Sequence, residues 1–285
     1  MTNPLFHSTD ILKFIKECLA EDIGSGDHSA NACIPASAQG QSRMLIKEQG
    51  IIAGLELAEV VFHQVDPNLK VTHLLQDGTP VQPGDVALLV TGSARNILTA
   101  ERLVLNLCQR LSGVATSTNR YVKELEGLHT KVLDTRKTTP GMRLLEKWAV
   151  KTGGGENHRI GLYDMIMIKD NHADFCGGLE AAIDQVHAYL KANNLNLRIE
   201  VETRNLQEVQ RTLAKGGIHR IMLDNFEVPA LKEAVQLINR QYETEASGGI
   251  TLQTIRSYAE TGVDYISVGA LTHSVKSLDI SLKAM

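Results

Sequence analysis

The chain has few cysteines, and none is placed for a metal or redox site. Cys18, Cys33, Cys108 and Cys176 are far apart, with no CxxC pair and no neighbouring Cys/His spacing suited to zinc. Free thiols in a reducing cytosol are the simplest interpretation of this pattern. We therefore expect no disulfide and no structural zinc.

The sequence also lacks a basic surplus, a long apolar run and a signal-peptide pattern. Its 29 Lys and Arg residues stand against 33 Asp and Glu, which gives a net charge of -4 and a pI near 6.2. No apolar run approaches the roughly 18 residues of a membrane span, and the N-terminus has no charged-then-apolar pattern. We therefore expect a cytoplasmic protein whose main partner is neither nucleic acid nor a membrane.

The composition is that of a globular protein, and the N-terminal part mixes helices with short strands. Of the 285 residues, 43% are hydrophobic and 22% are charged. Apolar periodicity predicts a helix over residues 4–20, capped near Ser8 to Asp10, and a second helix in AGLELAEVVFHQV. RMLIKE and residues 71–94 predict short antiparallel strands with Asp-Gly and Pro-Gly turns. The EDIGSGDHS loop after the first helix is explained by turn chemistry alone.

A long helix then marks the end of this part of the chain. It is predicted from Ile97 to about Arg120, with Leu98 among its apolar positions. Arg102 falls on another face, where an arginine is ordinarily solubilising. Because the pattern changes after this helix, we assign residues 1–115 to an N-terminal domain and residues 116–271 to a second domain.

The second domain alternates strands and helices. The predicted strands are KVLD, MIMIK, LRIEVE, HRIMLD, TEASG and DYISVG, with helical patterns such as LEAAIDQVHAYLKANN between them. Such alternation predicts parallel strands joined by right-handed crossovers. Six strands are fewer than the eight of a complete (β/α) barrel, so we expect an open or partial α/β barrel, or further strands that the pattern does not reveal.

Polar residues or glycine close each predicted strand. They are Arg136, Lys169, Glu202, Asp224, Ser247 and Gly269, at intervals of 33, 33, 22, 23 and 22 residues by subtraction. The C-terminal ends of barrel strands form one active-site face, so these residues are expected to converge although they are remote in sequence.

Cationic residues gather in the stretch from Asp134 to His172. Arg136–Lys137, His158–Arg159 and Lys169 each lie beside turn-forming or glycine-rich sequence, where binding surfaces are usually built. Arg presents a planar fork to a carboxylate or phosphate, and Lys presents a point charge. This predicts a receptor for a ligand with several negative charges.

Three further basic residues in this stretch are expected at the surface. Arg143, Lys147 and Lys151 fall on the polar side of a short helix whose apolar side carries Met142 and Leu145. We therefore predict that they are solvated and take no part in binding.

The last strand ends suit a phosphate, and the middle ones suit a ribose or a metal. Ser247-Gly248-Gly249 and Gly269 lie where exposed backbone N–H groups commonly hold a phosphate in barrel enzymes. Glu202 and Asp224 supply carboxylates for ribose hydroxyls, for a divalent cation held mainly by substrate phosphates, or for developing positive charge. An anionic ring held beside a phosphorylated sugar is the layout that phosphoribosyl transfer needs.

Several motifs of the sequence resemble those of a known family. DTRKTTPGMRLLEKWAVKTGGGENHR, followed by IKDNH, IEVE, LDN, ASGGI and SVGALTHS, is similar to quinolinate phosphoribosyltransferase over nearly the whole chain. The resemblance implies an N-terminal α/β sandwich and an incomplete α/β barrel. It also implies that the tail, residues 272–285, returns to pack on the N-terminal domain. His28-Ser29 departs from the family loop, where a threonine is expected.

The resemblance implies a reaction and roles for the candidate residues. Quinolinate and phosphoribosyl pyrophosphate would give nicotinate mononucleotide, pyrophosphate and CO₂ with Mg²⁺, in de novo NAD synthesis. The implied quinolinate ligands are Arg136, His158, Arg159 and Lys169, and Thr135 is a further substrate-binding residue. Lys137 would lie between the substrates, Glu202 and Asp224 would contact ribose and metal, and Ser247, Gly248, Gly249 and Gly269 would hold phosphate. The implied catalytic set is Lys137, Lys169, Glu202 and Asp224. Arg102 would reach the site of a neighbouring subunit in a homodimer, with higher assembly left open.

Other interpretations of the residues remain open. A homologue with altered substrate, such as the related protein found with molybdate transport genes, or a phosphoribosyltransferase for a monocarboxylate would share the fold. A Schiff-base aldolase would use Lys169 at its strand end. A phosphate-ligand sensor on the same scaffold would bind without turnover.

Overall fold

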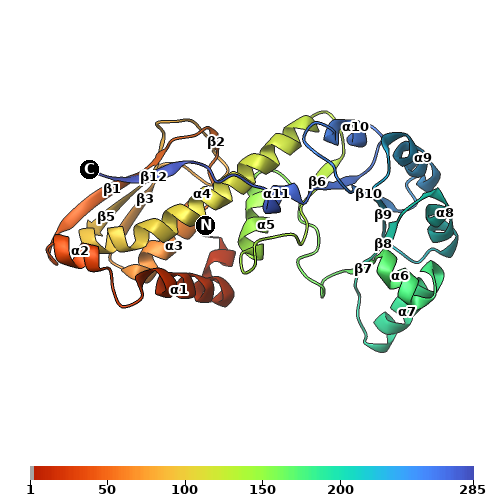
Figure 1. Cartoon of the computed structure of the whole chain (residues 1–285), viewed down its shortest axis with the longest axis horizontal. Helices are drawn as coiled ribbons and strands as arrows, with labels where there is room; N and C mark the ends of the chain where they lie inside the picture. Colours follow the sequence, from red (N-terminus) through yellow and green to blue (C-terminus); the bar gives the residue numbers. More distant parts are fainter. Residues whose placement is uncertain (1–2) are drawn as a thin grey trace. The chain divides into compact units, whose positions relative to one another are not determined.

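The computed structural model describes residues 3–285, which divide into two compact units (Figure 1). Unit 1 contains Met1–Ser117, Pro140–Gly153 and Val275–Met285, and unit 2 contains Thr118–Thr139 and Gly154–Ser274. No helix in the described part of the chain is long and apolar enough to cross a membrane. All four cysteines are free, as the sequence predicts.

Unit 1 is built around a four-stranded antiparallel sheet in the order β12-β1-β5-β3. Its first elements are η1 (Pro4–His7), α1 (Thr9–Ile23), α2 (His28–Cys33), β1 (Gln39–Ile46), β2 (Gly50–Ile51), α3 (Leu55–Val65), β3 (Lys70–His73), β4 (Pro80–Val81) and β5 (Val86–Ser93). The second predicted helix and the short antiparallel strands are thus confirmed. The helix predicted over residues 4–20 is divided at Ser8 into the 3-10 helix η1 and the α-helix α1. The C-terminal strand β12 (Ile280–Ala284) pairs with β1, from Ile46 opposite Ile280 to Ser42 opposite Ala284.

The loop after α1 owes its composition to helix capping. The Asp27 carboxylate accepts a hydrogen bond from the Ala30 N–H at 2.9 Å and so begins α2, because the first N–H groups of a helix have no partner within it. The same carboxylate accepts from the Thr99 hydroxyl at 3.1 Å. Both contacts agree with the interpretation of this loop as turn chemistry.

The long helix α4 spans Ala94–Glu124, a few residues beyond the predicted range at each end. Leu105 and Leu111 are buried, but Leu98 is 43% exposed, so its assignment to the apolar side was wrong. Leu98 lies near the start of the helix, where a periodic pattern defines the buried face least well. Arg102 is exposed.

The short helix α5 (Arg143–Thr152) groups with unit 1, although the predicted second domain included its residues. Trp148 packs edge-on against Phe6 with ring centroids 4.9 Å apart, and Glu146 forms an ion pair with Arg110 at 2.7 Å. Lys147 is only 1% exposed, so the prediction that it is solvated was wrong. Because the adjacent charged residues Glu146 and Lys147 are both buried, this helix is enclosed on its polar side as well as on its apolar side.

Unit 2 contains all six predicted strands, and they form one parallel sheet in the order β6-β11-β10-β9-β8-β7. They are β6 (Lys131–Leu133), β7 (Ile166–Ile168), β8 (Ile199–Thr203), β9 (Arg220–Asp224), β10 (Glu243–Ser247) and β11 (Tyr265–Ser267). The helices are α6 (Asp170–Cys176), α7 (Leu179–Ala192), α8 (Leu206–Lys215), α9 (Val228–Ile238), α10 (Ile255–Ala259) and α11 (Ala270–His273). Figure 1 shows α7, α8 and α9 along the outer side of the curved sheet.

The barrel stays open between its two edge strands. Beyond β6 the sheet continues only as a parallel bridge between Leu133 and Glu156, in which the Glu156 N–H donates to the Val132 carbonyl at 2.8 Å. Within residues 3–285 no ladder joins β6 to β7. The low strand count therefore reflects an incomplete barrel, as predicted.

Candidate active site

The predicted strand-end residues lie at one edge of the parallel sheet. Lys169 directly follows β7, Glu202 lies within β8, Asp224 and Ser247 are the last residues of β9 and β10, Gly269 follows β11, and Arg136 is in the loop after β6. Since the strands are parallel and adjacent, their carboxyl ends share this edge. Ser247 is in register with Asp224, which places two of the candidates directly side by side.

Lys169 and Glu202 form an ion pair between the Nζ and Oε2 atoms. The Glu202 side chain is 7% exposed, whereas the Lys169 side chain is 45% exposed. The Lys169 N–H also donates to His172 Nδ1 at 2.9 Å, which fixes the start of α6. The pair therefore presents a cation to solvent while its carboxylate partner is shielded.

Asp224 and the glycine turn after β10 are held together by side-chain hydrogen bonds. The Ser247 hydroxyl donates to Asp224 Oδ1 at 2.5 Å, and the Asn225 amide donates to Oδ2 at 2.6 Å. Gly248 has φ +94°, and a Cβ there would lie 2.2 Å from Asn225 Oδ1, so only glycine fits. Gly249 has φ +61° and faces open space. The turn thus leaves room beside Asp224 for a ligand to approach the backbone.

Lys137 is positioned against the end of β11. Its carbonyl accepts a hydrogen bond from the Thr272 hydroxyl at 2.8 Å, and its N–H donates to Thr135 Oγ1 at 3.0 Å. A Cβ at Gly269 would lie 3.1 Å from Lys137 Cδ and 3.0 Å from His273 Nε2. Glycine at this position therefore allows the lysine to lie close to the last strand end.

Arg136 and Arg159 carry like charges close enough to affect each other. Burial, and next the charge of Arg136, lower the pKa of Arg159. Arg159 Nη1 donates to the Met165 carbonyl at 3.1 Å, and Nη2 contacts Met167 Sδ at 3.8 Å. A bound anion would relieve this repulsion, so the two guanidinium groups together favour a carboxylate or phosphate ligand.

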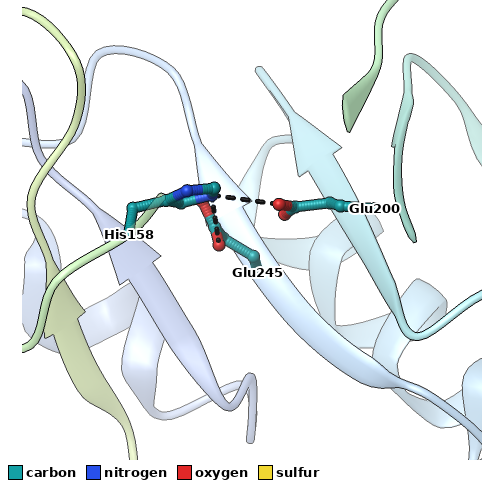
Figure 2. Close-up of side chains that lie close together, drawn as sticks. All are labelled: His158, Glu200 and Glu245. Atoms are coloured by element: carbon teal, nitrogen blue, oxygen red, sulfur yellow. Dashed lines mark ion pairs between the residues drawn. The ribbon is translucent and has the colours of Figure 1, made fainter. Parts of the chain in front are cut away.

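His158 lies deeper, among buried carboxylates. Its Nε2 is 3.0 Å from Glu200 Oε2 and 3.4 Å from Glu245 Oε2 (Figure 2). The main-chain N–H of His158 donates to Asp134 Oδ1 at 2.9 Å, which holds the segment around His158 at the end of β6. Arg220 Nη1 in turn lies 2.7 Å from Glu245 Oε2. The barrel interior therefore holds a charged cluster beneath the strand-end residues.

Glu200, Arg220 and Glu245 were not predicted from the sequence. A signal was present, because Glu200 lies two residues before Glu202 and Glu245 lies two before Ser247. Alternate residues of a strand share a face, so each belongs to the same side of the sheet as a predicted site residue.

The predicted site residues do not all fall in one unit. Arg102 lies on α4 in unit 1, whereas the others lie in unit 2. In the described part of the chain, the one group of three side chains able to share a metal ion is His158, Glu200 and Glu245.

One cavity lies away from these residues. It has a volume of ≈ 460 Å³ and is lined by residues at or before the starts of the strands, namely His129, Arg240, Tyr242, Glu243 and Asp264. A smaller cavity of ≈ 60 Å³ borders Glu202. Because barrel enzymes use the carboxyl ends of their strands, we assign the candidate site to that end.

Comparison with known proteins identifies the family. Residues 27–112 match the N-terminal domain of quinolinate phosphoribosyl transferase, and residues 114–283 match the C-terminal domain of the same family. The chain belongs to the quinolinate phosphoribosyl transferase family.

Members of the family are similar to the chain over most of its length. It is 49% identical to quinolinate phosphoribosyltransferase [decarboxylating] 2b, mitochondrial, of Nicotiana tabacum, over 98% of the chain and 84% of that protein. The probable nicotinate-nucleotide pyrophosphorylase [carboxylating] of Bacillus subtilis is 42% identical over 95% of the chain and 92% of its own length. NadC from Streptococcus pyogenes superposes with a TM-score of 0.91 at 40% identity, covering 96% of each chain. The family fold is thus that of this chain.

Proposed function

We propose that the chain is a decarboxylating quinolinate phosphoribosyltransferase of NAD biosynthesis. It would combine quinolinate with phosphoribosyl pyrophosphate and release nicotinate mononucleotide, pyrophosphate and CO₂. Family membership supports the activity. The observation that carries the assignment of the site is that the charge of Arg136 acts on Arg159, whose guanidinium contacts Met165 and Met167 in the segment that leads to Lys169. A dicarboxylate needs several cations in one region.

The substrates divide the strand-end face between them. Arg136, His158, Arg159 and Lys169 form the receptor for the two quinolinate carboxylates, and Thr135 supports the same loop. The 5-phosphate of the ribose approaches the turn formed by Ser247, Gly248 and Gly249 and the end of β11 at Gly269. Lys137, which packs against Gly269, lies between the two substrates.

Glu202 and Asp224 face the ribose in this arrangement. As pyrophosphate leaves, the ribose C1 gains positive charge, and nearby carboxylates stabilise it. The nucleophile is the pyridine nitrogen, so the chain need not supply one. Holding that nitrogen close to C1 in the correct direction is the main catalytic task of the cationic receptor.

The carboxylates fit a magnesium ion that the substrate brings. Mg²⁺ usually binds through one or two carboxylates plus substrate phosphates and waters. Asp224 and Glu202 offer two such carboxylates. The Asp224 carboxylate is already oriented by hydrogen bonds from Ser247 and Asn225. Bound Mg²⁺ would take up negative charge on the departing pyrophosphate.

Decarboxylation follows from the charge of the product ring. Once the nitrogen carries ribose, the cationic ring accepts the electron pair of the bond to the C2 carboxylate. CO₂ leaves, and a solvent proton takes its place on C2. The receptor contributes by orienting that carboxylate, and no further cofactor is needed.

We also propose that the enzyme works as a homodimer in the cytoplasm. Arg102 is exposed on α4 and would enter the site of the neighbouring subunit. Mixing an inactive Arg102→Ala protein with an inactive Lys169→Met protein, with unfolding and reassembly, tests this. Recovery of activity in the mixture is expected, because one hybrid site keeps both residues; no recovery contradicts the shared site.

The aldolase interpretation is disfavoured by the surroundings of Lys169. Schiff-base lysines are desolvated or lie beside another cation, whereas Lys169 is 45% exposed and paired with Glu202. Borohydride trapping of substrate on the protein would revive this interpretation.

The reaction is tested by pyrophosphate release with quinolinate, phosphoribosyl pyrophosphate and Mg²⁺, beside the same assay with nicotinate. Release with quinolinate alone is the expected result. Release with nicotinate alone would assign the protein to a monocarboxylate. Release with neither, from folded protein, would favour an altered substrate or a binding role.

A further inference from the structure

Arg220 is enclosed within the unit 2 barrel and has no part in the reaction steps above. It is the first residue of β9, and its side chain is 11% exposed. Asp224, the last residue of the same strand, belongs to the strand-end face. The four residues of strand between them span roughly 13 Å, at about 3.3 Å per residue. Arg220 therefore begins well below the face where the substrates are expected.

The guanidinium group of Arg220 joins three neighbouring strands. Nη1 donates to Glu245 Oε2 at 2.7 Å, while Nη2 and Nε donate to Glu243 Oε2 at 2.9 and 3.0 Å, both from β10. The group also lies over the Tyr265 ring of β11, 4.1 Å from the ring centroid. A planar fork held by several partners has little freedom to move. Arg220 thus fixes the Glu245 side chain within the barrel.

One oxygen atom of Glu245 lies between Arg220 and His158. Oε2 accepts the hydrogen bond from Arg220 and is also 3.4 Å from His158 Nε2 (Figure 2). Glu200 contacts the same ring nitrogen at 3.0 Å from the side of β8. Glu245 is 0% exposed, and a buried carboxylate is strongly disfavoured without a partner. The place of this carboxylate beside the ring therefore depends on Arg220.

His158 needs such support because it lies outside the strands, in the segment between α5 and β7. Its main-chain N–H donates to Asp134 Oδ1, and the Arg159 N–H donates to its Nδ1 at 2.7 Å. Its other ring nitrogen meets the two buried carboxylates. Residues of connecting segments are less fixed than those of strands unless their side chains are held. The contacts inside the barrel thus determine where the ring lies.

Arg198 provides a matched comparison for Arg220. Its Nη2 donates to the same Glu243 oxygen at 2.6 Å, but its side chain is 50% exposed. Among residues 3–285, Arg198 forms an ion pair with Glu243 alone, whereas Arg220 also pairs with Glu245. Removing Arg198 therefore disturbs Glu243 without breaking the connection to His158.

We propose that Arg220 is a positioning residue for the anion receptor: it holds Glu245 Oε2 against the His158 ring and so keeps the receptor in place for a substrate carboxylate. Arg220 acts through Glu245 and does not touch the substrate. The proposal rests on the proposed function, because it takes quinolinate as the ligand.

The first test compares Arg220→Met with Arg198→Met by steady-state pyrophosphate release. In Arg220→Met the KM for quinolinate is expected to rise roughly ten- to a hundredfold, since a small displacement of a binding group is costly. The KM for phosphoribosyl pyrophosphate is expected to stay unchanged, and Arg198→Met is expected to keep both values. An unchanged quinolinate KM in folded Arg220→Met overturns the proposal. An equal rise in both KM values also overturns it, since the barrel would then be disturbed as a whole.

A double-mutant cycle tests the route through Glu245. It compares the unaltered enzyme, Arg220→Met, Glu245→Gln and the double variant. Residues that act through one another give non-additive effects. The rise in quinolinate KM caused by Arg220→Met should therefore be much smaller when Glu245 is already replaced. The same fold-change in both backgrounds overturns the proposal, because Arg220 would then act by another route.

Arg220→Lys covers the case in which Arg220→Met does not fold. Lysine keeps the enclosed positive charge but lacks the planar fork that holds Glu243 and Glu245 together. The quinolinate KM is expected to rise roughly three- to tenfold, with the KM for phosphoribosyl pyrophosphate unchanged. A quinolinate KM equal to that of the unaltered enzyme overturns the proposal.

The position of the ring is tested without substrate. In ¹H–¹³C NMR of the free protein, the His158 ring signal is assigned by its loss in His158→Gln. Arg220→Met is expected to shift this signal, and Arg198→Met is expected to leave it in place. An unshifted signal in Arg220→Met overturns the proposal. Absence of turnover with quinolinate in the unaltered enzyme contradicts the proposed function instead, and the NMR comparison then still decides whether Arg220 positions the ring.

Discussion

The Lys169 ammonium and the Glu202 carboxylate meet across the ends of β7 and β8, although 33 residues separate them in sequence. In the proposed site, the pair joins the cationic receptor to the carboxylates assigned to the ribose. One side chain of the pair is exposed and the other is buried, so a ligand that binds Lys169 changes the charge environment of a shielded acid. The two proposed substrate regions are thus electrostatically linked.

Replacing Lys169 by Met is expected to lower kcat/KM for quinolinate by roughly 100-fold or more, since it removes a ligand cation and leaves Glu202 without its partner. The measurement is steady-state pyrophosphate release. Lys191→Met, at an exposed position of α7, serves as the control and should match the unaltered enzyme. Equal activity of the two variants would remove Lys169 from the site.

Asp224→Asn keeps the size of the side chain and removes its charge. We expect the Mg²⁺ concentration for half-maximal rate to rise about tenfold or more, because a carboxylate is a far better ligand for a hard cation than an amide. The control is Asp184→Asn, whose carboxylate is exposed and pairs with Lys215. An unaltered Mg²⁺ dependence would contradict the role of Asp224.

Arg136→Ala is expected to weaken quinolinate binding by about 2 to 5 kcal/mol, partly because a substrate carboxylate loses its partner. Arg136→Lys should recover only part of this loss, since lysine lacks the planar fork. Calorimetric titration of quinolinate gives the affinities, with Arg240→Ala, an exposed arginine before β10, as the control. Equal affinity of the Ala variant and the unaltered enzyme would exclude Arg136 as a ligand.

Gly248→Ala and Gly249→Ala form a matched pair. Alanine at Gly248 combines φ +94° with a Cβ 2.2 Å from Asn225 Oδ1, whereas alanine at Gly249 has φ +61° and open space. We expect a loss of about 1 to 3 kcal/mol in the free energy of unfolding for Gly248→Ala and a smaller loss for Gly249→Ala. Urea unfolding measures this, and the KM for phosphoribosyl pyrophosphate should rise more in the first variant. Equal losses in the free energy of unfolding in the two variants would show that the Asn225 side chain moves aside to accommodate the added methyl group.

The buried cluster predicts that stability falls as pH rises. The pKa of Glu200 is raised from 4.5 to about 7 and that of His158 from 6.5 to about 9. A group with a raised pKa contributes stability that is complete below its unfolded value and is lost as pH rises through its folded value. The free energy of unfolding should therefore decline between about pH 5 and pH 9. Urea unfolding of Glu200→Gln should show a flatter decline below about pH 7, and an equally steep one would contradict this linkage.

Local pattern was enough to predict the strands of the barrel and the edge where the candidate residues gather. Each strand is a short apolar run that ends in a polar residue or glycine, and parallel topology alone then brings Asp224 beside Ser247. These features depend on residues close in sequence and on one topological rule, so no partner had to be known in advance.

Burial of charge could not be predicted in this way. Lys147 lies on what reads as a polar helix face, and only the surroundings supplied by remote segments enclose it. Glu200 and Glu245 read as ordinary strand residues until His158 and Arg220 are placed beside them. Pairings of this kind are decided by packing between distant parts of the chain, which a local pattern does not contain.

The pairing of β12 with β1 has a consequence for synthesis. In the sheet of unit 1, β12 covers the outer edge of β1, and its residues follow all of unit 2 in the sequence. A ribosome therefore completes every strand of unit 2 while that edge is still bare. Premature termination shortly before β12 would release a chain with an unpaired edge strand, which is prone to pair with other chains. Translation through β12 thus protects the first unit against aggregation.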